Sequence, residues 1–161
     1  MTKTKVIINV SDAKVSNNPT DTLVTYSLGS CIGVCLYDPV ARIGGMLHYQ
    51  LPESKLDPEK AEQKPFMFAD TGMKLLINKL IAMGAIKKRM QVKIAGGAQM
   101  QNGPGGFDIG KRNHLAIRKI FWKNCMFIDT EDVGGNAPRN LYLEIEDGSV
   151  SIKSNGCDKK L

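Results

Sequence analysis

Three side chains in one short stretch, Thr25, Cys31 and His48, carry the groups of an activated cysteine nucleophile. A free thiol is mostly protonated at neutral pH and attacks as the thiolate, so Cys31 needs a base. The imidazole of His48 can be that base, and the hydroxyl of Thr25 can hold it in one tautomer. Gly29 and Ser30, directly before Cys31, permit a sharp turn whose backbone N–H groups could stabilise an oxyanion. The pattern predicts a Cys-His-Thr triad that attacks a carbonyl carbon.

The same residue types also fit less reactive roles. A cysteine in an apolar strand commonly packs in the core, and a histidine near a strand end is commonly structural. Cys31, Cys35 and His48 could instead bind zinc, although no second Cys/His pair follows at zinc-finger spacing. His114 could rival His48 as the base, but its setting, KRNHLAIRK, is typical of a surface position.

A predicted β-hairpin positions the candidate nucleophile and base. The apolar segments 32–38 and 43–50 are predicted strands, joined by a turn that starts at an Asp-Pro pair. Such a hairpin brings the start of its first strand, next to Cys31, close to the end of its second strand, which carries His48. A helix that begins at Ser30 would also suit the chemistry, because its positive end would lower the pKa of the Cys31 thiol. The run is too short for its periodicity to decide between strand and helix.

The rest of the chain predicts an α+β fold with mixed, largely antiparallel sheets. Amphipathic helices are predicted near 70–84, capped by Asp70 or Thr71, and near 110–123, capped by Asp108. The segments 11–20 and 53–64 are predicted loops. Further strands are predicted near 4–10, 22–28, 90–95, 125–129, 140–146 and 149–153, the last two joined by a hairpin turn at Asp147-Gly148.

The predicted strand 22–28 matters for the site because it carries Thr25. Strict alternation would place Leu23, Thr25 and Ser27 on one face, and Val24, Tyr26 and Leu28 on the other. If the second face packs in the core, Thr25 points into the other layer, where a site could lie.

Composition sets broad limits on the class of protein. The 161 residues fit one domain, 1–161, and the polar segment 154–161 is predicted to be a loose tail. The net charge of +6 is spread without a dense basic stripe and aromatics are scarce, which argues against nucleic-acid binding. The four cysteines are not spaced as a disulfide framework. With no apolar run long enough for a membrane span and no signal peptide, we expect a cytoplasmic protein without membrane insertion.

Several motifs together resemble the chemoreceptor glutamine deamidase family, CheD. The most specific are LGSCIGVCLYDP at 28–39 and GGMLHYQLP at 44–52. Similar blocks follow in the same order, namely KIAGGAQM at 93–100, IGKRN at 109–113 and DVGG at 132–135 with Arg139 nearby. Family members often have Gly-Arg after the DVGG-type block, whereas this chain has Asn-Ala-Pro before Arg139, so the loop 134–139 departs from the family pattern.

This resemblance implies an activity and a site. It implies that Cys31 is the nucleophile, His48 the base and Thr25 the third member of a triad that converts glutamine side chains of chemoreceptors to glutamate. It also implies a layered α/β sandwich related to bacterial toxin deamidases, no metal or organic cofactor, and a CheC-type chemotaxis phosphatase as a partner. The glycine-rich segment 96–106 is expected near the site, and Asn113 is expected to hold a loop by side-chain hydrogen bonds.

Two other classes of function stay open. In one, the chain is a non-catalytic chemotaxis adaptor that binds a receptor or the phosphatase, and Cys31 only packs. In the other, the same thiol chemistry serves a transglutaminase-like or peptidase reaction, because the acyl-transfer step is shared and only the acceptor or the scissile bond differs.

Overall fold

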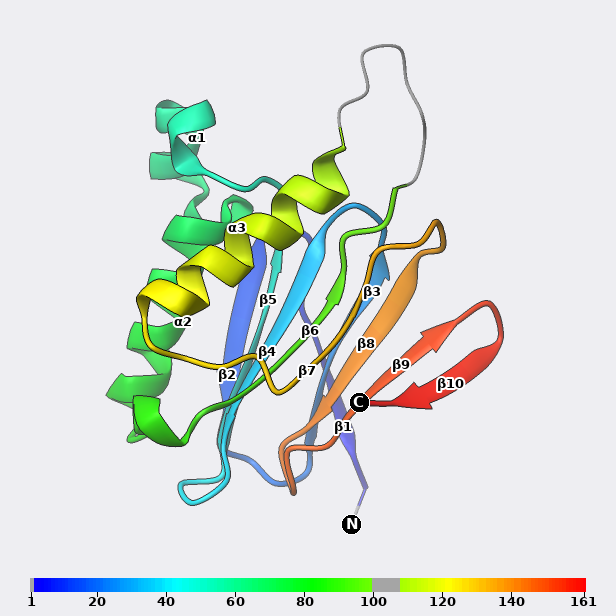
Figure 1. Ribbon diagram of the computed structural model, residues 1–161. Helices are drawn as coiled ribbons and strands as arrows, with labels where there is room; N and C mark the ends of the chain where they lie inside the picture. Colours follow the sequence, from blue (N-terminus) through cyan, green and yellow to red (C-terminus); the bar gives the residue numbers. More distant parts are fainter. Residues whose placement is uncertain (1, 100–107) are drawn as a thin grey trace.

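The computed structural model describes residues 2–99 and 108–161, and in them two five-stranded sheets and three α-helices form a layered fold (Figure 1). The first sheet has the order β1 (Thr4–Ile7), β3 (Asp21–Leu28), β8 (Arg139–Glu144), β9 (Val150–Ser154) and β10 (Cys157–Lys160). The second has the order β2 (Asp12–Ser16), β5 (Ile43–Tyr49), β4 (Ile32–Asp38), β6 (Gln91–Gly96) and β7 (Thr130–Val133). The helices are α1 (Pro58–Gln63), α2 (Ala69–Ala82) and α3 (Ile109–Lys123), with short 3-10 turns at Ser54–Leu56, Pro65–Met67 and Lys87–Arg89.

Both sheets are mixed and mainly antiparallel, as the sequence predicts. The pairs β1–β3 and β6–β7 are parallel, and the other paired strands of the described residues are antiparallel. Two interior strands of the second sheet, β4 and β5, are buried along their whole length. A strand that is covered on both faces is expected to read as a nearly continuous apolar run, and both of these do.

Two apolar cores explain this burial. Helices α2 and α3 cover one face of the second sheet, and their core includes Val34, Leu47, Leu76 and Phe121 (Figure 1). The first sheet packs on the other face, and the core between the two sheets includes Leu141. The three layers are therefore helices, second sheet and first sheet, which matches the expected layered α/β sandwich.

The predicted hairpin is confirmed as β4 and β5. Its register places Gly33 opposite His48, so the start of one strand meets the end of the other as expected. The side chains of β4 alternate between the two cores: Ile32 and Val34 belong to the helix-side core, whereas Cys35 belongs to the core between the sheets. The closing hairpin at Asp147-Gly148 is confirmed too, because β8 and β9 pair across it.

One predicted loop and one predicted strand are wrong. The segment 11–20, predicted as a loop, contains β2, which pairs with β5 and forms an edge of the second sheet. The apolar run 125–129, predicted as a strand, is the turn after α3: Cys125 has a φ of +56° and the Met126 amide donates back to the carbonyl of Phe121. The strand of that region is β7, which begins later, at Thr130.

Three further local predictions need correction. The predicted loop 53–64 contains α1, capped by Asp57 at the Lys60 amide. Helix α2 begins after Phe68 with no side-chain cap, because the Asp70 carboxylate instead accepts hydrogen bonds from Ser54. Asp108 does cap α3, as predicted. The segment 154–161, expected as a loose tail, contains β10, which pairs with β9.

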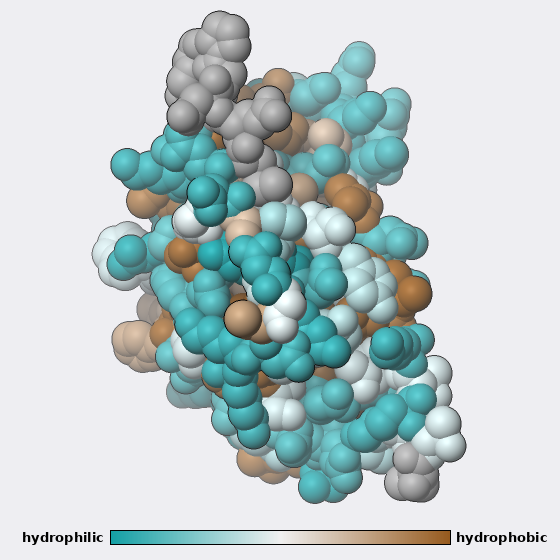
Figure 2. Space-filling model, turned by 90° about the vertical axis from the view of Figure 1, so that its right-hand side faces the viewer, coloured by the Kyte–Doolittle hydropathy of each residue, from teal (hydrophilic) through white to brown (hydrophobic). Residues whose placement is uncertain are grey.

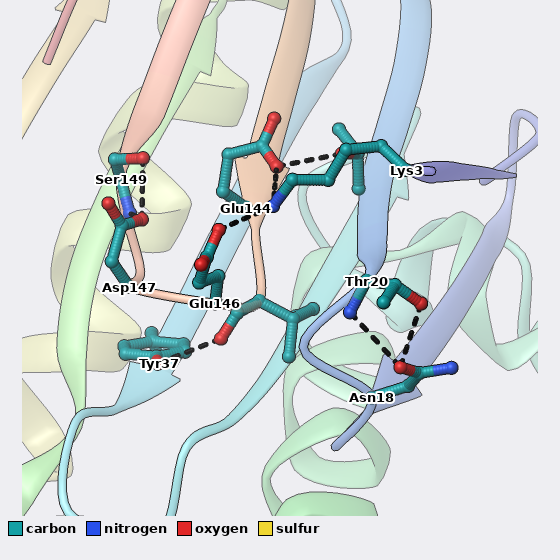
Figure 3. A network of polar contacts seen from close by, with 10 residues as sticks. Lys3, Asn18, Thr20, Tyr37, Glu144, Glu146, Asp147 and Ser149 are labelled. Carbon is teal, nitrogen blue, oxygen red and sulfur yellow. Dashed lines mark hydrogen bonds and ion pairs between the residues drawn. The ribbon is translucent and has the colours of Figure 1, made fainter. Parts of the chain in front are cut away.

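Polar contacts join neighbouring segments at the end of the fold where β4 ends, which is the opposite end of β4 from Cys31 (Figure 3). The Tyr37 hydroxyl donates to the carbonyl of Ile145 at 2.9 Å and so joins β4 to the chain after β8. Lys3 pairs with Glu146 at 2.8 Å and with Glu144 at 3.3 Å. Since exposed ion pairs stabilise a fold little, the buried Tyr37 contact and the core dominate here.

The outer surface on the side of the first sheet is largely hydrophilic (Figure 2). This agrees with an antiparallel sheet that packs one face in the core and turns the other to solvent. Within residues 2–99 and 108–161, no helix is long and apolar enough to cross a membrane.

Candidate active site

Thr25 and His48 meet between the two sheets. Thr25 lies on β3 of the first sheet and His48 near the end of β5 of the second, and each is about 1% exposed. The Oγ1 atom of Thr25 lies 2.7 Å from Nδ1 of His48 and 2.7 Å from the carbonyl oxygen of Ile8. The pairing of β3 with β8 is interrupted by a bulge at Ser27, which has a φ of +58°. Because of this bulge, Leu28 points into the core on the same side as Thr25. The strict alternation predicted for 22–28 is therefore wrong at Leu28.

These two contacts fix the tautomer of His48. A hydroxyl has one hydrogen to donate, and the carbonyl of Ile8 can only accept, so Thr25 donates to Ile8. The Thr25 oxygen must then accept a hydrogen from Nδ1 of His48, which leaves Nε2 unprotonated. That Nε2 atom is buried and has no hydrogen-bond partner in the described part of the chain. The geometry therefore presents a free imidazole lone pair, which is what a general base needs.

We predict that Thr25→Val lowers kcat about 10²-fold, because valine keeps the shape but can neither accept from Nδ1 nor fix the tautomer. Thr25→Ser keeps the hydroxyl and should stay within about tenfold of the wild type. The valine variant should also lose roughly 1–3 kcal/mol of unfolding free energy, because it leaves Nδ1 and the Ile8 carbonyl buried without partners. Steady-state kinetics and urea unfolding measure both effects, and equal activity of the two variants would contradict this role for Thr25.

Cys31 lies in a bend immediately before β4, so it is neither within a strand nor at the start of a helix. It is partly exposed and packs against the core between the sheets, on the side where His48 also lies. The structure holds no hydrogen bond between Cys31 and His48, since Nε2 has no partner among the described residues. Catalytic hydrogen bonds are often long in a free enzyme and tighten when substrate binds.

The end of β6 holds the Cys31 turn by backbone contacts. The Gly97 amide donates to the carbonyl of Cys31 at 2.8 Å, and the Ala98 amide donates to the carbonyl of Gly29 at 2.9 Å. Gly96 has a φ of +114°, and a Cβ added there would overlap the carbonyl oxygen of Cys31. The prediction that the glycine-rich segment 96–106 lies near the site is thus confirmed for residues 96–98, while 100–106 lie outside the described residues.

We predict that Gly96→Ala disrupts both stability and activity. The new methyl group meets backbone rather than a flexible side chain, so the Cys31 turn must move, and the positive φ adds strain. We expect a loss of about 3 kcal/mol in unfolding free energy and a larger fall in kcat than the folded fraction explains. Gly156→Ala is the matched control, because its φ is +77° but its added Cβ has no atom within 4 Å. Urea unfolding and kinetics of both variants test this, and similar losses in the two would contradict it.

Two side chains, one on α3 and one on β8, also hold the backbone around Cys31 by hydrogen bonds. Asn113 on α3 donates from Nδ2 to the carbonyls of Ser30 and Gln50, each at 2.9 Å, which confirms that it holds a loop. Arg139 on β8 donates to the carbonyls of Gly96, at 3.1 Å, and Gly134, at 2.7 Å, and also contacts Asp132. The loop 134–139, which departs from the family pattern, is therefore tied to the strand end that supports Cys31.

Sequence reasoning missed the roles of Ile8 and Gly96. The Ile8 carbonyl is a backbone group, so its role as a hydrogen-bond acceptor cannot be predicted from the type of residue. For Gly96, the Gly-Gly pair after an apolar run signals an unusual backbone, but not the contact with Cys31.

Burial sets the protonation states of the pair. It lowers the pKa of His48 to about 4, so the imidazole is neutral at neutral pH. Burial also raises the pKa of the Cys31 thiol, an effect that the hydrogen bond of its own backbone amide partly opposes. At neutral pH the two groups are therefore a neutral thiol and a neutral imidazole, so a nucleophilic attack by the thiol would require its proton to move at the same time.

The low pKa of His48 predicts a dependence of stability on pH. Because its folded-state pKa of about 4 lies below the ordinary value of 6.5, the unfolded chain binds more protons between these values. Keeping His48 neutral contributes about 3 kcal/mol to the free energy of unfolding, and this contribution is fully present above pH 6.5. It is lost as the pH falls toward and through 4. Urea unfolding at pH 7, 5.5 and 4 should show this loss in the wild type and a smaller one in His48→Gln. Parallel curves for the two proteins would contradict it.

The other candidates from the sequence are not part of this arrangement. His114 faces Glu131 of β7, with Nε2 2.9 Å from the carboxylate, so it is engaged elsewhere. Cys35 is 2% exposed in the core between the sheets, and burial raises its pKa far above the ordinary range. Among the described residues, no group of three or more His, Cys, Asp or Glu side chains could hold a metal ion. Cys125 and Cys157 are exposed free thiols.

Comparison with known proteins agrees with the resemblance of the motifs. A family model described as CheD chemotactic sensory transduction matches residues 50–154. A probable chemoreceptor glutamine deamidase CheD 1 from Syntrophus aciditrophicus is 52% identical over 94% of both chains. Relatives named probable chemoreceptor glutamine deamidase CheD from Solibacter usitatus and CheD 2 from Anaeromyxobacter dehalogenans are 46% and 43% identical, over 98% and 92% of this chain. Although the family-model match begins after His48, these alignments extend over nearly the whole chain, and the chain therefore belongs to the CheD family.

Proposed function

We propose that this protein is a cysteine-dependent chemoreceptor glutamine deamidase, which hydrolyses glutamine side chains of chemoreceptors to glutamate and releases ammonia. The observation that carries the proposal is the buried Thr25–His48 pair, which leaves Nε2 free on the side of the core where Cys31 packs. The names of the relatives support the choice of substrate, since each is called a probable chemoreceptor glutamine deamidase.

In the first half of the proposed reaction, Nε2 of His48 takes the thiol proton as the Cys31 sulfur attacks the carboxamide carbon of glutamine. The carbonyl oxygen becomes an oxyanion, which the backbone N–H groups of the turn at Ser30 and Cys31 stabilise. Collapse of this tetrahedral intermediate breaks the C–N bond. The proton on Nε2 passes to the leaving nitrogen, so ammonia departs and a thioester to Cys31 remains.

In the second half, water attacks the thioester while Nε2 of His48 accepts a proton from it. The C–S bond breaks, the proton returns to the Cys31 sulfur, and the product is a glutamate side chain on the receptor. Every proton is carried by His48, so the proposed reaction needs neither a metal nor an organic cofactor. A neutral imidazole suits this role, because it can accept one proton in the first half of the reaction, release it to the leaving nitrogen, and accept another in the second half.

The proposed setting is cytoplasmic, since the receptor region that is modified in this family is helical and cytoplasmic. Glutamate in place of glutamine adds negative charge to the receptor, and the net charge of +6 on this chain suits an acidic protein partner. A CheC-type phosphatase is proposed as a second partner on the family resemblance alone.

Peptide mass spectrometry tests the proposed function. The cytoplasmic fragment of a chemoreceptor from the same source is incubated with the protein, digested and analysed. We expect particular glutamines to gain about 1 Da, the difference between NH2 and OH on an acyl carbon. Binding of the fragment without any mass change would overturn the proposal in favour of a non-catalytic adaptor. Cleavage of the fragment, or its coupling to an added amine without hydrolysis, would indicate a peptidase or a transglutaminase instead.

A further inference from the structure

Asn113 occupies an unusual place in the fold. It lies on α3 and is fully buried, yet its side chain contacts the two segments that carry the nucleophile and the base. One hydrogen of Nδ2 goes to the carbonyl of Ser30, directly before Cys31, and the other to the carbonyl of Gln50, two residues after His48. The backbone carbonyl of Asn113 in turn accepts from the Tyr49 hydroxyl at 2.6 Å.

The contact with Ser30 acts on a particular peptide group. The carbonyl of Ser30 and the amide N–H of Cys31 belong to the same planar peptide unit, so fixing one fixes the direction of the other. The next peptide unit is held as well, because the Cys31 carbonyl accepts from Gly97. Both peptide groups that flank Cys31 are thus fixed from outside the turn, one by Asn113 and one by the end of β6.

An amide side chain is suited to this position. Two hydrogen-bond donors on one nitrogen match the two carbonyls that face it. An aspartate would place an acceptor against those carbonyls, and an alanine would leave both unpaired. The Oδ1 atom of Asn113 is buried without a partner among the described residues, so within them this side chain forms hydrogen bonds through Nδ2 alone. A residue that only filled space here would not need this amide.

We propose that Asn113 is a positioning residue for the deamidation, which sets the direction of the Cys31 N–H toward the oxyanion and ties the nucleophile turn to the strand that carries His48. This inference rests on the proposed function and adds to it a residue that does not touch substrate. A hydrogen bond to the Ser30 carbonyl also polarises the shared peptide group, which makes the Cys31 N–H a stronger donor.

The test compares Asn113→Ala and Asn113→Asp with Asn124→Ala. Asn124 is a matched control, because it lies at the other end of α3 and its Nδ2 also donates to a backbone carbonyl, that of Ile120, at 2.8 Å. Thermal unfolding first fixes a temperature at which all the proteins are folded. At that temperature, kcat and KM for glutamine conversion are measured on a receptor fragment, together with the rate at which iodoacetamide alkylates Cys31.

We expect the Asn113 variants to lose about 10²-fold or more in kcat, the usual cost of a lost oxyanion donor, with KM within about threefold. Alkylation forms no oxyanion and depends only on the thiol and its base, so its rate should fall at least about tenfold less than kcat. Asn124→Ala should match the wild type in all three. A fall in kcat no larger than that of Asn124→Ala, or an equal fall in alkylation, would overturn the proposal.

Hydrogen exchange gives a readout that does not depend on activity. The amides of Gly97 and Ala98 donate to the Cys31 turn, so loosening that turn should speed their exchange at least about tenfold in Asn113→Ala and not in Asn124→Ala. Unchanged exchange would overturn the positioning role. If the wild type converts no glutamine, the proposed function fails, and the exchange result still decides whether Asn113 positions the turn.

Discussion

Cys31→Ala is expected to abolish turnover and to leave the fold intact. In the proposed reaction the thiol forms the covalent intermediate, and loss of a nucleophile from an acyl-transfer enzyme costs about 10⁶-fold in kcat. Cys31 is partly exposed and lies in a bend, so removing its sulfur should change the unfolding free energy by less than about 1 kcal/mol. Ammonia release and urea unfolding measure the two quantities on one preparation.

Cys125→Ala is the control for this variant. Cys125 is an exposed thiol in the turn after α3, and its removal should leave kcat unchanged. Turnover by Cys31→Ala at even a hundredth of the wild-type rate would exclude Cys31 as the nucleophile. Loss of turnover in both variants would point to general damage by substitution.

His48→Gln is expected to have the second largest effect, a fall of about 10²–10⁴-fold in kcat. Glutamine is polar and close in size, but it cannot take the thiol proton or return it to the leaving nitrogen. The loss should affect both halves of the reaction, so no thioester should accumulate. Because the pKa of His48 is lowered to about 4, wild-type activity should persist as the pH falls below 6.5, as far as the protein stays folded.

His114→Gln is the matched control for His48→Gln. His114 lies on α3 and its side chain contacts Glu131 of β7, so its replacement should leave kcat within about twofold of the wild type. A result in which His48→Gln keeps more than a tenth of the activity would remove His48 from the role of base.

The local elements near the site could be predicted from the sequence because their signals are local. The β4–β5 hairpin follows from two apolar runs around an Asp-Pro turn, and its register brings Gly33 opposite His48. The cap of α3 at Asp108 follows from the residue type directly before an amphipathic helix. Such features depend on neighbours in the chain, which is why pattern reasoning finds them.

Features that depend on distant partners could not be predicted. Strand β2 is polar and short, and it is a strand because β5 offers it an edge. The apolar residues 125–129 have strand-like composition, but the chain must turn there after α3 before it can run parallel to β6. The bulge at Ser27 depends on the pairing of β3 with β8, and no residue type signals it.

The candidate site likewise combines residues that could be predicted from the sequence with contacts that could not. Thr25, Cys31 and His48 can be chosen from their chemistry and from the family motifs, and the structure joins Thr25 to His48. The proton acceptor for Thr25 is the carbonyl of Ile8, directly after β1, and the supports of the Cys31 turn come from the residues directly after β6 and from α3. These contacts join residues far apart in the sequence, so they require the fold.

The proposed reaction depends above all on a neutral His48 whose proton is on Nδ1. Nitrogen-15 NMR of the histidine side chains measures this directly, and the chain has only two histidines, so His114→Ala assigns the spectrum. We expect His48 to be protonated on Nδ1 alone at neutral pH and to take up its second proton near pH 4, as its lowered pKa requires. A proton on Nε2 at neutral pH, or titration at the ordinary value near 6.5, would contradict the account, because Nε2 would then not be the free base that Cys31 needs.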